Sequence, residues 1–158
     1  MSHLKRADII IFTKSDKLQP PQKILNRAKK TNLPIFYSSI KLNGFSKNGL
    51  TVYEPTSNTK AVAVSAIADT KNFYRSLEDI SIDVVSKISF FDHYEFKQTD
   101  IYDFKEALEK NNAEIIITTE KDLVRLNGLN LSGITICTLN IEFQLDDNGE
   151  KYINNFIS

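Results

Sequence analysis

Short apolar segments rich in Ile and Val alternate along this chain with segments that have the apolar spacing of helices. The first kind predicts strands at about residues 8–13, 34–40, 61–67, 83–90, 114–118 and 135–139. The second kind predicts helices at about residues 21–31, 70–78, 100–111 and 149–157. Such alternation is typical of βα units. The sequence therefore predicts the α/β class, with a mostly parallel sheet flanked by helices.

One stretch departs from this alternation. Strand-like residues 37–42 and 50–53 flank two Asn-Gly steps, Asn43-Gly44 and Asn48-Gly49, which favour turns with positive φ. We therefore expect a β-hairpin near residues 37–53. It lies between a basic and an acidic part of the chain, which suits a connector between domains.

Charge is divided unevenly along the chain. Residues 1–60 hold 11 Lys or Arg against 3 Asp or Glu, whereas residues 61–158 hold 9 against 17. Many of the cations surround the helix expected at residues 21–31, where they form either a solvated face or a surface for anionic lipid headgroups or phosphates. Because aromatic residues are not interleaved with them, we predict no nucleic-acid partner.

The composition is that of an ordinary folded protein, with 41% apolar and 25% charged residues. No apolar run approaches the roughly 20 residues that span a bilayer, and no signal peptide is visible. The single cysteine, Cys137, lies in a strand-like run, which predicts a buried thiol in a reducing compartment. One Cys and two distant His residues give no metal-ligand spacing, so no metal site is predicted.

The motif Thr13-Lys14-Ser15-Asp16 follows the first predicted strand. In P-loop GTPases the Asp of such a motif pairs with the guanine base and the Lys packs on the nucleotide, although the same pattern also occurs in solvated loops. The chain has no G-x-x-x-x-G-K-[ST] segment and no Gly followed by Lys. Thr13, Lys14 and Asp16 are therefore only weak candidates for a place near a nucleotide, and the chain alone is a poor candidate for phosphoryl transfer.

The pair Asp92-His93 follows the strand predicted at residues 83–90, at the edge where open α/β sheets bind ligands. An imidazole titrates near neutrality and can take or orient a proton. The plain alternative is a structural histidine among aromatic neighbours, with Asp92 as a turn residue.

Capping residues precede three predicted helices. Asp69 and Thr99 are placed to cap the helices at residues 70–78 and 100–111. Thr119, with Asp122 three residues on, forms a capping-box-like start for a further helix. Capping does not explain why Glu120 and Lys121 crowd the same loop, which could present a cation to a phosphate or hold a partner domain by salt bridges.

Several stretches in order resemble a known family: "LKRAD" before a strand and Thr-Lys, then the hairpin, "AVAVSAIADTKNFYRSL", "FFDHYEF" and "IITTEKDLVRL". Together they resemble the C-terminal part of tetraacyldisaccharide 4′-kinase, the lipid A 4′-kinase of Gram-negative bacteria, in the P-loop kinase superfamily. The resemblance covers essentially the whole chain. It implies that residues 1–33 end an N-terminal P-loop domain, residues 34–59 form a connecting hairpin, and residues 60–158 form a C-terminal α/β domain.

The resemblance implies an activity that needs more than this chain. A full-length enzyme would transfer the ATP γ-phosphate to the 4′-hydroxyl of a tetraacyldisaccharide 1-phosphate, with ATP and Mg²⁺. It would be cytoplasmic and peripheral on the inner membrane, with an anionic membrane surface, the acylated disaccharide lipid and the N-terminal P-loop domain as partners. The chain alone is expected to bind no nucleotide tightly and to be inactive.

The resemblance also implies residue roles. His93 would lie in the interdomain cleft and orient or support an acidic base from the N-terminal domain, while Asp92 would fix the ring of His93. The substrate or interdomain cleft would be lined by Thr119, Glu120, Lys121 and Asp122. The chain departs from the family where Ala66 and Ala68 replace two usual glycines, which puts close backbone contact with a ligand in doubt there.

Two other interpretations remain open at this level. The chain could be a non-catalytic α/β interaction module, or a fragment of a GTPase in which Thr13 to Asp16 recognise guanine. Nucleotide binding separates them, because selective micromolar GTP binding is expected only of the GTPase fragment.

Overall fold

The computed structural model describes residues 6–15, 19–49, 51–56, 58–80 and 82–157, which belong to two compact units. The terminal unit comprises Met1–Lys41 and Ile141–Ser158, and the central unit comprises Leu42–Asn140. Strands β2 (Ile35–Lys47) and β7 (Ile136–Leu145) contribute residues to both units. No helix in the described ranges is long and apolar enough to cross a bilayer.

These units differ from the predicted segments in two respects, because residues 141–158 group with the first part of the chain and residues 42–59 group with the central unit. Compactness reflects packing and does not test where one family domain ends and the next begins. The division at residues 33 and 59 therefore stays a prediction.

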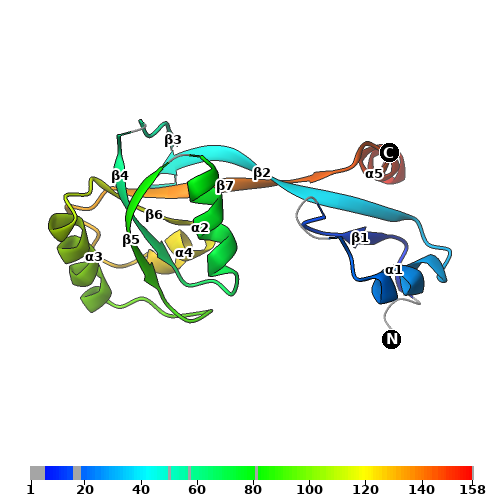
Figure 1. The fold of residues 1–158 in the computed structure, drawn as a ribbon, viewed down its shortest axis with the longest axis horizontal. Coiled ribbons are helices and arrows are strands. Elements are labelled where there is room, and N and C mark those ends of the chain that lie inside the picture. The colour runs from blue at the N-terminus through cyan, green and yellow to red at the C-terminus, as the bar shows by residue number, and fades with distance from the viewer. Residues whose placement is uncertain (1–5, 16–18, 50, 57, 81, 158) are drawn as a thin grey trace. The chain divides into compact units, whose positions relative to one another are not determined.

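The central unit contains a parallel sheet with the strand order β7, β6, β4 and β5 (Figure 1). Its strands β4 (Lys60–Ser65), β5 (Asp83–Ser89) and β6 (Ile115–Thr119) run in one direction, and β7 pairs parallel with β6. The predicted α/β class with a mostly parallel sheet is confirmed. Parallel strands present all their carboxyl ends at one edge, which positions the candidate site described below.

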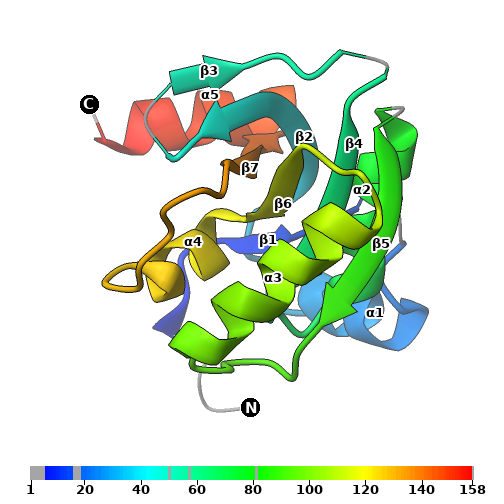
Figure 2. The same cartoon turned by 90° about the vertical axis from the view of Figure 1, so that its left-hand side faces the viewer.

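Helices cover both faces of this sheet, α2 (Thr70–Asp79) on one side and α3 (Gln98–Lys110) with α4 (Glu120–Leu126) on the other. Successive residues of a strand point to opposite faces. Ala61 and Ala63 therefore pack with the α2 side chains, and Val62 and Val64 pack with those of α3. Figure 2 looks onto the face that α3 covers. These four side chains are fully buried, which explains why β4 is apolar between Lys60 and Ser65.

Two of the three predicted helix caps are confirmed. The Asp69 carboxylate accepts a hydrogen bond from the Asn72 N–H at 3.3 Å, and the Thr119 hydroxyl accepts one from the Asp122 N–H at 3.1 Å. The prediction that Thr99 caps the next helix is wrong. Helix α3 begins at Gln98, because the Asp100 carboxylate accepts a hydrogen bond from the Lys97 N–H at 2.7 Å and so ties down the chain before Gln98.

A β-hairpin is present, but its turn is shorter than predicted. Residues Phe45–Lys47 of β2 pair antiparallel with β3 (Thr51–Tyr53). Only the Asn48-Gly49 step forms the turn, whereas Asn43-Gly44 lies inside β2. The two strands expected at residues 34–40 and 37–42 are therefore one 13-residue strand. The Asn48 N–H donates to the Ile136 carbonyl at 2.8 Å, a long-range contact that local sequence cannot indicate.

The terminal unit contains β1 (Ile10–Phe12), which pairs parallel with β2, and the helices α1 (Gln22–Lys29) and α5 (Asp147–Ile157). Asp146 holds β2 and α5 together. Its carboxylate accepts from the Tyr37 N–H at 3.0 Å and from the Gly149 N–H at 2.7 Å. Helix α5 therefore starts two residues earlier than predicted, and β7 extends six residues beyond its predicted end at Leu139.

The single cysteine lies inside the sheet, as predicted. Cys137 on β7 is fully buried, and desolvation raises the pKa of its thiol to about 11. At neutral pH the thiol is therefore protonated and acts as a small apolar side chain.

Candidate functional site

The carboxyl edge of the central sheet brings together residues from three strand ends. Ala66 follows β4, Asp92-His93 follow β5, and Thr119 ends β6 and leads into α4. The structure thus places the two predicted motifs, at residues 92–93 and 119–122, side by side. This edge is where ligands bind in open parallel sheets.

Asp122 is the buried anchor of this site. Its side chain has no exposed surface, and one carboxylate oxygen accepts from the Ala66 N–H at 3.0 Å and from the Thr119 hydroxyl at 2.8 Å. The other carboxylate oxygen lies 3.1 Å from an Arg125 guanidinium nitrogen. A buried carboxylate needs such partners, because an unpaired charge in a sheet interior is strongly unfavourable.

Arg125 lies one turn along α4 from Asp122 and contacts three different elements. Its Nη1 donates to the Ala66 carbonyl at 2.8 Å as well as to Asp122, and its Nη2 lies 3.2 Å from His93 Nδ1. Only 19% of its side chain is exposed. The planar guanidinium has several donors in fixed directions, which suits it to join three acceptors at once.

His93 is held by its backbone and by its ring. Its φ of 64° lies in the left-handed region, which is uncommon for a non-glycine residue, and its N–H donates to the Asp92 carboxylate at 3.0 Å. Its Nε2 lies 3.5 Å from the same carboxylate, and 75% of the side chain is exposed. The loop therefore presents an imidazole to the outside with one nitrogen fixed against Arg125.

Asp92 lies between the His93 ring and the Lys121 ammonium group, with Lys121 Nζ 3.5 Å from the carboxylate oxygen that does not face His93 Nε2. Partial desolvation raises the pKa of this carboxyl. The electrostatic interactions with His93 and Lys121 and the hydrogen bonds from both residues lower the pKa by a larger amount. The pKa of Asp92 therefore lies below its ordinary value of 3.8. Asp92 is a carboxylate at neutral pH and balances the positive side chains near it.

The remaining predicted cleft residues differ in exposure. Glu120 and Lys121 are exposed at the start of α4, whereas Thr119 is half-buried and Asp122 is buried. Helix capping accounts for the contact between Thr119 and Asp122. Asp122 also binds Ala66 and Arg125. Its role in the structure is therefore wider than capping.

The two positions where the chain departs from the family glycines differ in their surroundings. Ala66 is fully buried and has negative φ, and both of its backbone polar groups are bound by side chains of α4. Ala68 is exposed. At Ala66, the first residue beyond β4, the backbone N–H is bound by Asp122 and the carbonyl by Arg125.

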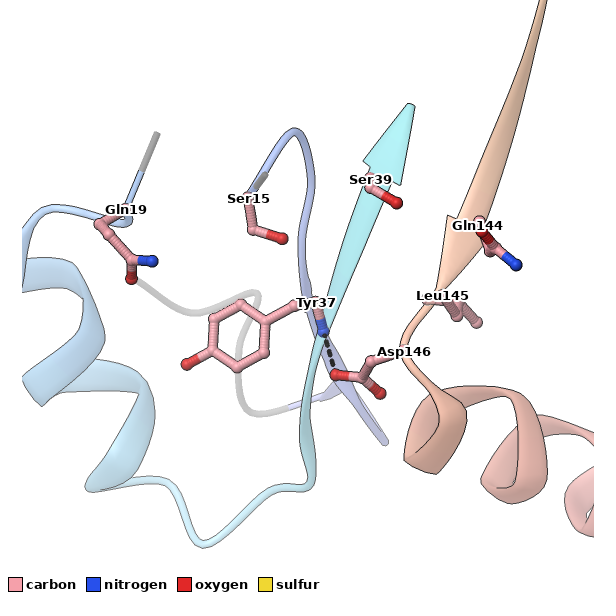
Figure 3. A pocket seen from close by; sticks show the side chains of 7 residues that line it. All are labelled: Ser15, Gln19, Tyr37, Ser39, Gln144, Leu145 and Asp146. Atoms are coloured by element: carbon pink, nitrogen blue, oxygen red, sulfur yellow. Dashed lines mark hydrogen bonds between the residues drawn. The ribbon is translucent and has the colours of Figure 1, made fainter. Parts of the chain in front are cut away.

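The turn after β1 carries the first motif. Lys14 has a φ of 57°, and the Ser15 N–H and hydroxyl both lie 3.0 Å from the Ser38 carbonyl, so the turn is fastened to β2. Asp16 lies outside the described residues. A pocket of about 440 Å³ opens beside this turn (Figure 3). It is lined by Ser15, Gln19, Tyr37, Ser39, Gln144, Leu145 and Asp146.

The described residues that line this pocket present hydroxyl and amide groups, one aromatic ring and one carboxylate, and none of them is cationic. The Asp146 carboxylate already accepts two backbone N–H groups, as Figure 3 shows for Tyr37. The lining therefore suits an uncharged polar ligand better than a phosphate.

Among the described residues, no group of three or more His, Cys, Asp or Glu side chains is arranged to hold a metal ion. Asp92 and Glu120 are exposed carboxylates at the carboxyl edge of the central sheet, and the His93 ring and Lys121 already flank Asp92. This donor set does not fit Mg²⁺, which prefers several oxygen ligands.

Arg125 is the site residue that the motifs did not indicate. It lies within the "IITTEKDLVRL" stretch but outside the charged segment at residues 119–122. One signal was available: an arginine three residues after a capping Asp lies on the same face of a helix. That spacing predicts the Asp122 contact but not the contacts with residues 66 and 93.

The comparisons with known proteins agree with one another. The model of the family described as LpxK, tetraacyldisaccharide-1-P 4′-kinase, matches residues 1–158. The tetraacyldisaccharide 4′-kinase of Syntrophobacter fumaroxidans is 30% identical over 153 residues, covering 92% of this chain and 40% of that protein. That of Desulfatibacillum aliphaticivorans is 29% identical over 157 residues, covering 89% of this chain and 40% of that protein.

A crystal structure of LpxK from Aquifex aeolicus in complex with ATP has a similar fold. It is 22% identical, with a TM-score of 0.56, and the match covers 93% of this chain and 51% of that one. The chain thus spans about 40% of the length of the curated relatives named above. The family match extends over every residue, so this chain belongs to the tetraacyldisaccharide 4′-kinase family.

Proposed function

We propose that this chain is the C-terminal part of a lipid A 4′-kinase. Such an enzyme transfers the ATP γ-phosphate to the 4′-hydroxyl of a tetraacyldisaccharide 1-phosphate. Family membership over all residues supports the reaction class, and the coverage of about 40% of the relatives supports the assignment to one part of a longer protein. The observation that carries the assignment of a site is the convergence of Asp92, His93 and the α4 start at one sheet edge.

Phosphoryl transfer depends mainly on positioning and on neutralising charge. The attacking hydroxyl must also lose its proton, and a carboxylate supported by a histidine can accept it. We propose that His93 supports an acidic base supplied by the N-terminal domain. Asp92 would hold the ring, and Lys121 would sit close enough to Asp92 to balance its charge. Thr119 and Glu120 would border the same cleft.

Substitution of His93 tests this role. In a full-length kinase that includes this chain, His93→Ala should lower kcat by about 10²-fold, because the base loses its support. The KM for ATP should change little. Stability should also change little, since the side chain is 75% exposed. Tyr102→Ala, which removes another exposed ring of the central unit, is the control. An unchanged kcat for His93→Ala would rule out the role.

The nucleotide site is proposed to lie chiefly in the N-terminal domain, with ATP and Mg²⁺ held by its phosphate-binding loop. Thr13 and Lys14 adjoin the pocket that Ser15 lines, so this pocket is the candidate for the base or ribose. A titration of the 158-residue chain with a fluorescent ATP analogue and a fluorescent GTP analogue tests the assignment. We expect no tight binding of either, whereas selective micromolar GTP binding would favour a GTPase fragment and overturn it.

We further propose that the full-length enzyme works at the cytoplasmic face of the inner membrane of a Gram-negative bacterium. Helix α1 supports this placement. Lys23, Arg27, Lys29 and Lys30 are exposed there, and Ile24 is 52% exposed among them. Basic side chains around an exposed apolar one suit an anionic lipid surface.

A further inference from the structure

We infer that Arg125 is a positioning residue that fixes which nitrogen of His93 carries the proton, and so makes the outward-facing nitrogen a hydrogen-bond donor. The inference starts from the 3.2 Å contact between Arg125 Nη2 and His93 Nδ1. It rests on the proposed function only for the use made of that outward nitrogen.

A guanidinium carries only donors and stays protonated at any ordinary pH. A hydrogen bond between it and an imidazole nitrogen therefore requires a lone pair on that nitrogen. In the observed position, Nδ1 of His93 is the acceptor and the neutral ring carries its proton on Nε2. An imidazolium, with hydrogens on both nitrogens, would have to leave this position.

Arg125 is held in place by buried partners. Its Nη1 is bound by the Ala66 carbonyl and by the fully buried Asp122 carboxylate, and only 19% of the side chain is exposed. Asp122 in turn is bound by the Ala66 N–H and the Thr119 hydroxyl. The guanidinium is thus held by the ends of β4 and β6, while Nη2 is directed at the loop that follows β5. A group held in this way can orient a flexible, exposed ring.

The contact with Arg125 determines what the His93 ring can do. Nε2 then has one hydrogen to donate, and its 3.5 Å separation from the Asp92 carboxylate is too long for a good hydrogen bond, which leaves this hydrogen for a base outside this chain. A donor at this position can support a carboxylate but cannot itself take the proton of a substrate hydroxyl through Nε2. His93 would therefore act as the supporter of an acidic base and not as the base.

The test is a long-range ¹H–¹⁵N NMR spectrum of the chain labelled with ¹⁵N-histidine, in alkaline buffer where an imidazole is neutral. His3 and His93 are the only histidines, so His3→Gln leaves one ring to observe. We expect the Nε2–H tautomer, with the Nδ1 resonance displaced from that of free N-acetylhistidine amide in the direction of an acceptor nitrogen. An Nδ1–H tautomer in this chain would overturn the inference without any further variant.

Arg125→Met should move the Nδ1 resonance to the free value, and Arg125→Lys, which keeps a cationic donor, should restore part of the displacement. Arg75→Met removes an exposed arginine of α2 and should change nothing. Lys121→Met removes the cation beside Asp92 and should leave Nδ1 unchanged. If Nδ1 stays displaced in Arg125→Met while the Ala66 amide shifts, the inference is wrong. The Ala66 shift shows that the network was broken in a folded chain.

Kinetics of a full-length kinase that includes this chain give a second readout. Arg125→Met should lower kcat about as much as His93→Ala does and leave the KM for ATP unchanged, with partial recovery in Arg125→Lys. The double variant should be no worse than either single one, because both changes remove the same support. If the NMR result holds but His93→Ala has normal kcat, the proposed function fails and the positioning inference stands.

Discussion

Asp122 is a fully buried carboxylate whose charge is balanced by Arg125. Asp122→Asn keeps the shape but removes the charge. With its amide oxygen accepting from the Ala66 N–H and the Thr119 hydroxyl, its N–H₂ group faces the Arg125 guanidinium, which is also a donor. We expect the free energy of unfolding to fall by about 3 kcal/mol, as when one partner of a buried ion pair is removed. Urea unfolding followed by circular dichroism measures the change.

The matched control is Asp79→Asn at the exposed end of α2, which should change the free energy of unfolding by less than about 0.5 kcal/mol. Equal effects of the two substitutions would show that the Asp122 network contributes little to stability.

Asp92 makes stability depend on pH, because its pKa in the folded chain lies below the ordinary value of 3.8. A lowered carboxyl pKa adds stability above the unfolded-state pKa, and this is lost as the pH falls through the folded-state pKa. Wild type should therefore be more stable than Asp92→Asn at pH 7, and the difference should disappear in acid. Urea titrations of both proteins from pH 7 to about pH 2.5 test this, and a difference that persists in acid would contradict it.

At the residue scale, sequence indicates what neighbours along the chain can do. The Asp69 and Thr119 caps involve partners three residues away, and both were predicted. The contacts of Arg125 with Ala66 and His93 span 59 and 32 residues, so they exist only once the sheet has formed. The family resemblance implied that Asp92 and His93 share a cleft with residues 119–122, and their proximity follows physically because parallel strands end at the same edge.

At the scale of elements, the two Asn-Gly steps of β2 and its turn differ in what surrounds them. Gly44 and Gly49 both have positive φ, but a Cβ at Gly49 would lie 3.0 Å from Leu123 Cδ2. At Gly44 a Cβ would have no atom of the described, non-adjacent residues within 4 Å. Both Gly→Ala variants should lose about 1 kcal/mol for the left-handed backbone. Gly49→Ala should lose more, because Leu123 must also move.

Thermal unfolding of the two alanine variants side by side isolates the contribution of this contact. In a Leu123→Ala background, Gly49→Ala should lose this excess, because the shorter side chain removes the clash; Leu123→Ala alone is the reference, since Leu123 packs against the core. If Gly44→Ala were the more damaging change, the assignment of the turn to Asn48-Gly49 would be wrong.

The same two steps show where prediction of elements from sequence reached its limit. An Asn-Gly pair favours a turn, and at Asn48-Gly49 the turn formed. At Asn43-Gly44 the chain continues as a strand, which local propensity opposes and which distant pairing partners stabilise. The long apolar strand β4 and the amphipathic helix α2 needed no such help, and their predicted positions were close to those observed.

At the scale of the whole molecule, the separation of charge predicts how the chain meets a membrane. The 158-residue chain should sediment with vesicles of phosphatidylglycerol and not with phosphatidylcholine, and rising salt should weaken binding. The double variant Lys23→Glu/Arg27→Glu should bind at least about tenfold more weakly, since each basic side chain near an anionic surface contributes about 1 kcal/mol.

The control is Lys71→Glu/Lys110→Glu, which makes the same change in net charge on exposed positions of α2 and α3. An equal loss for both pairs would mean that net charge, and not the basic surface of α1, governs binding. No loss in either would remove the support that α1 gives to a peripheral location.

The hydrogen bonds of Asp122 and Arg125 to the Ala66 backbone also constrain which substitutions can accumulate at positions 122 and 125 during evolution. Replacing either partner alone leaves the other charge buried without a counter-charge. Both routes of single substitutions to an uncharged pair therefore pass through a protein of lower stability. Substitutions at positions 122 and 125 should therefore be rare and coupled.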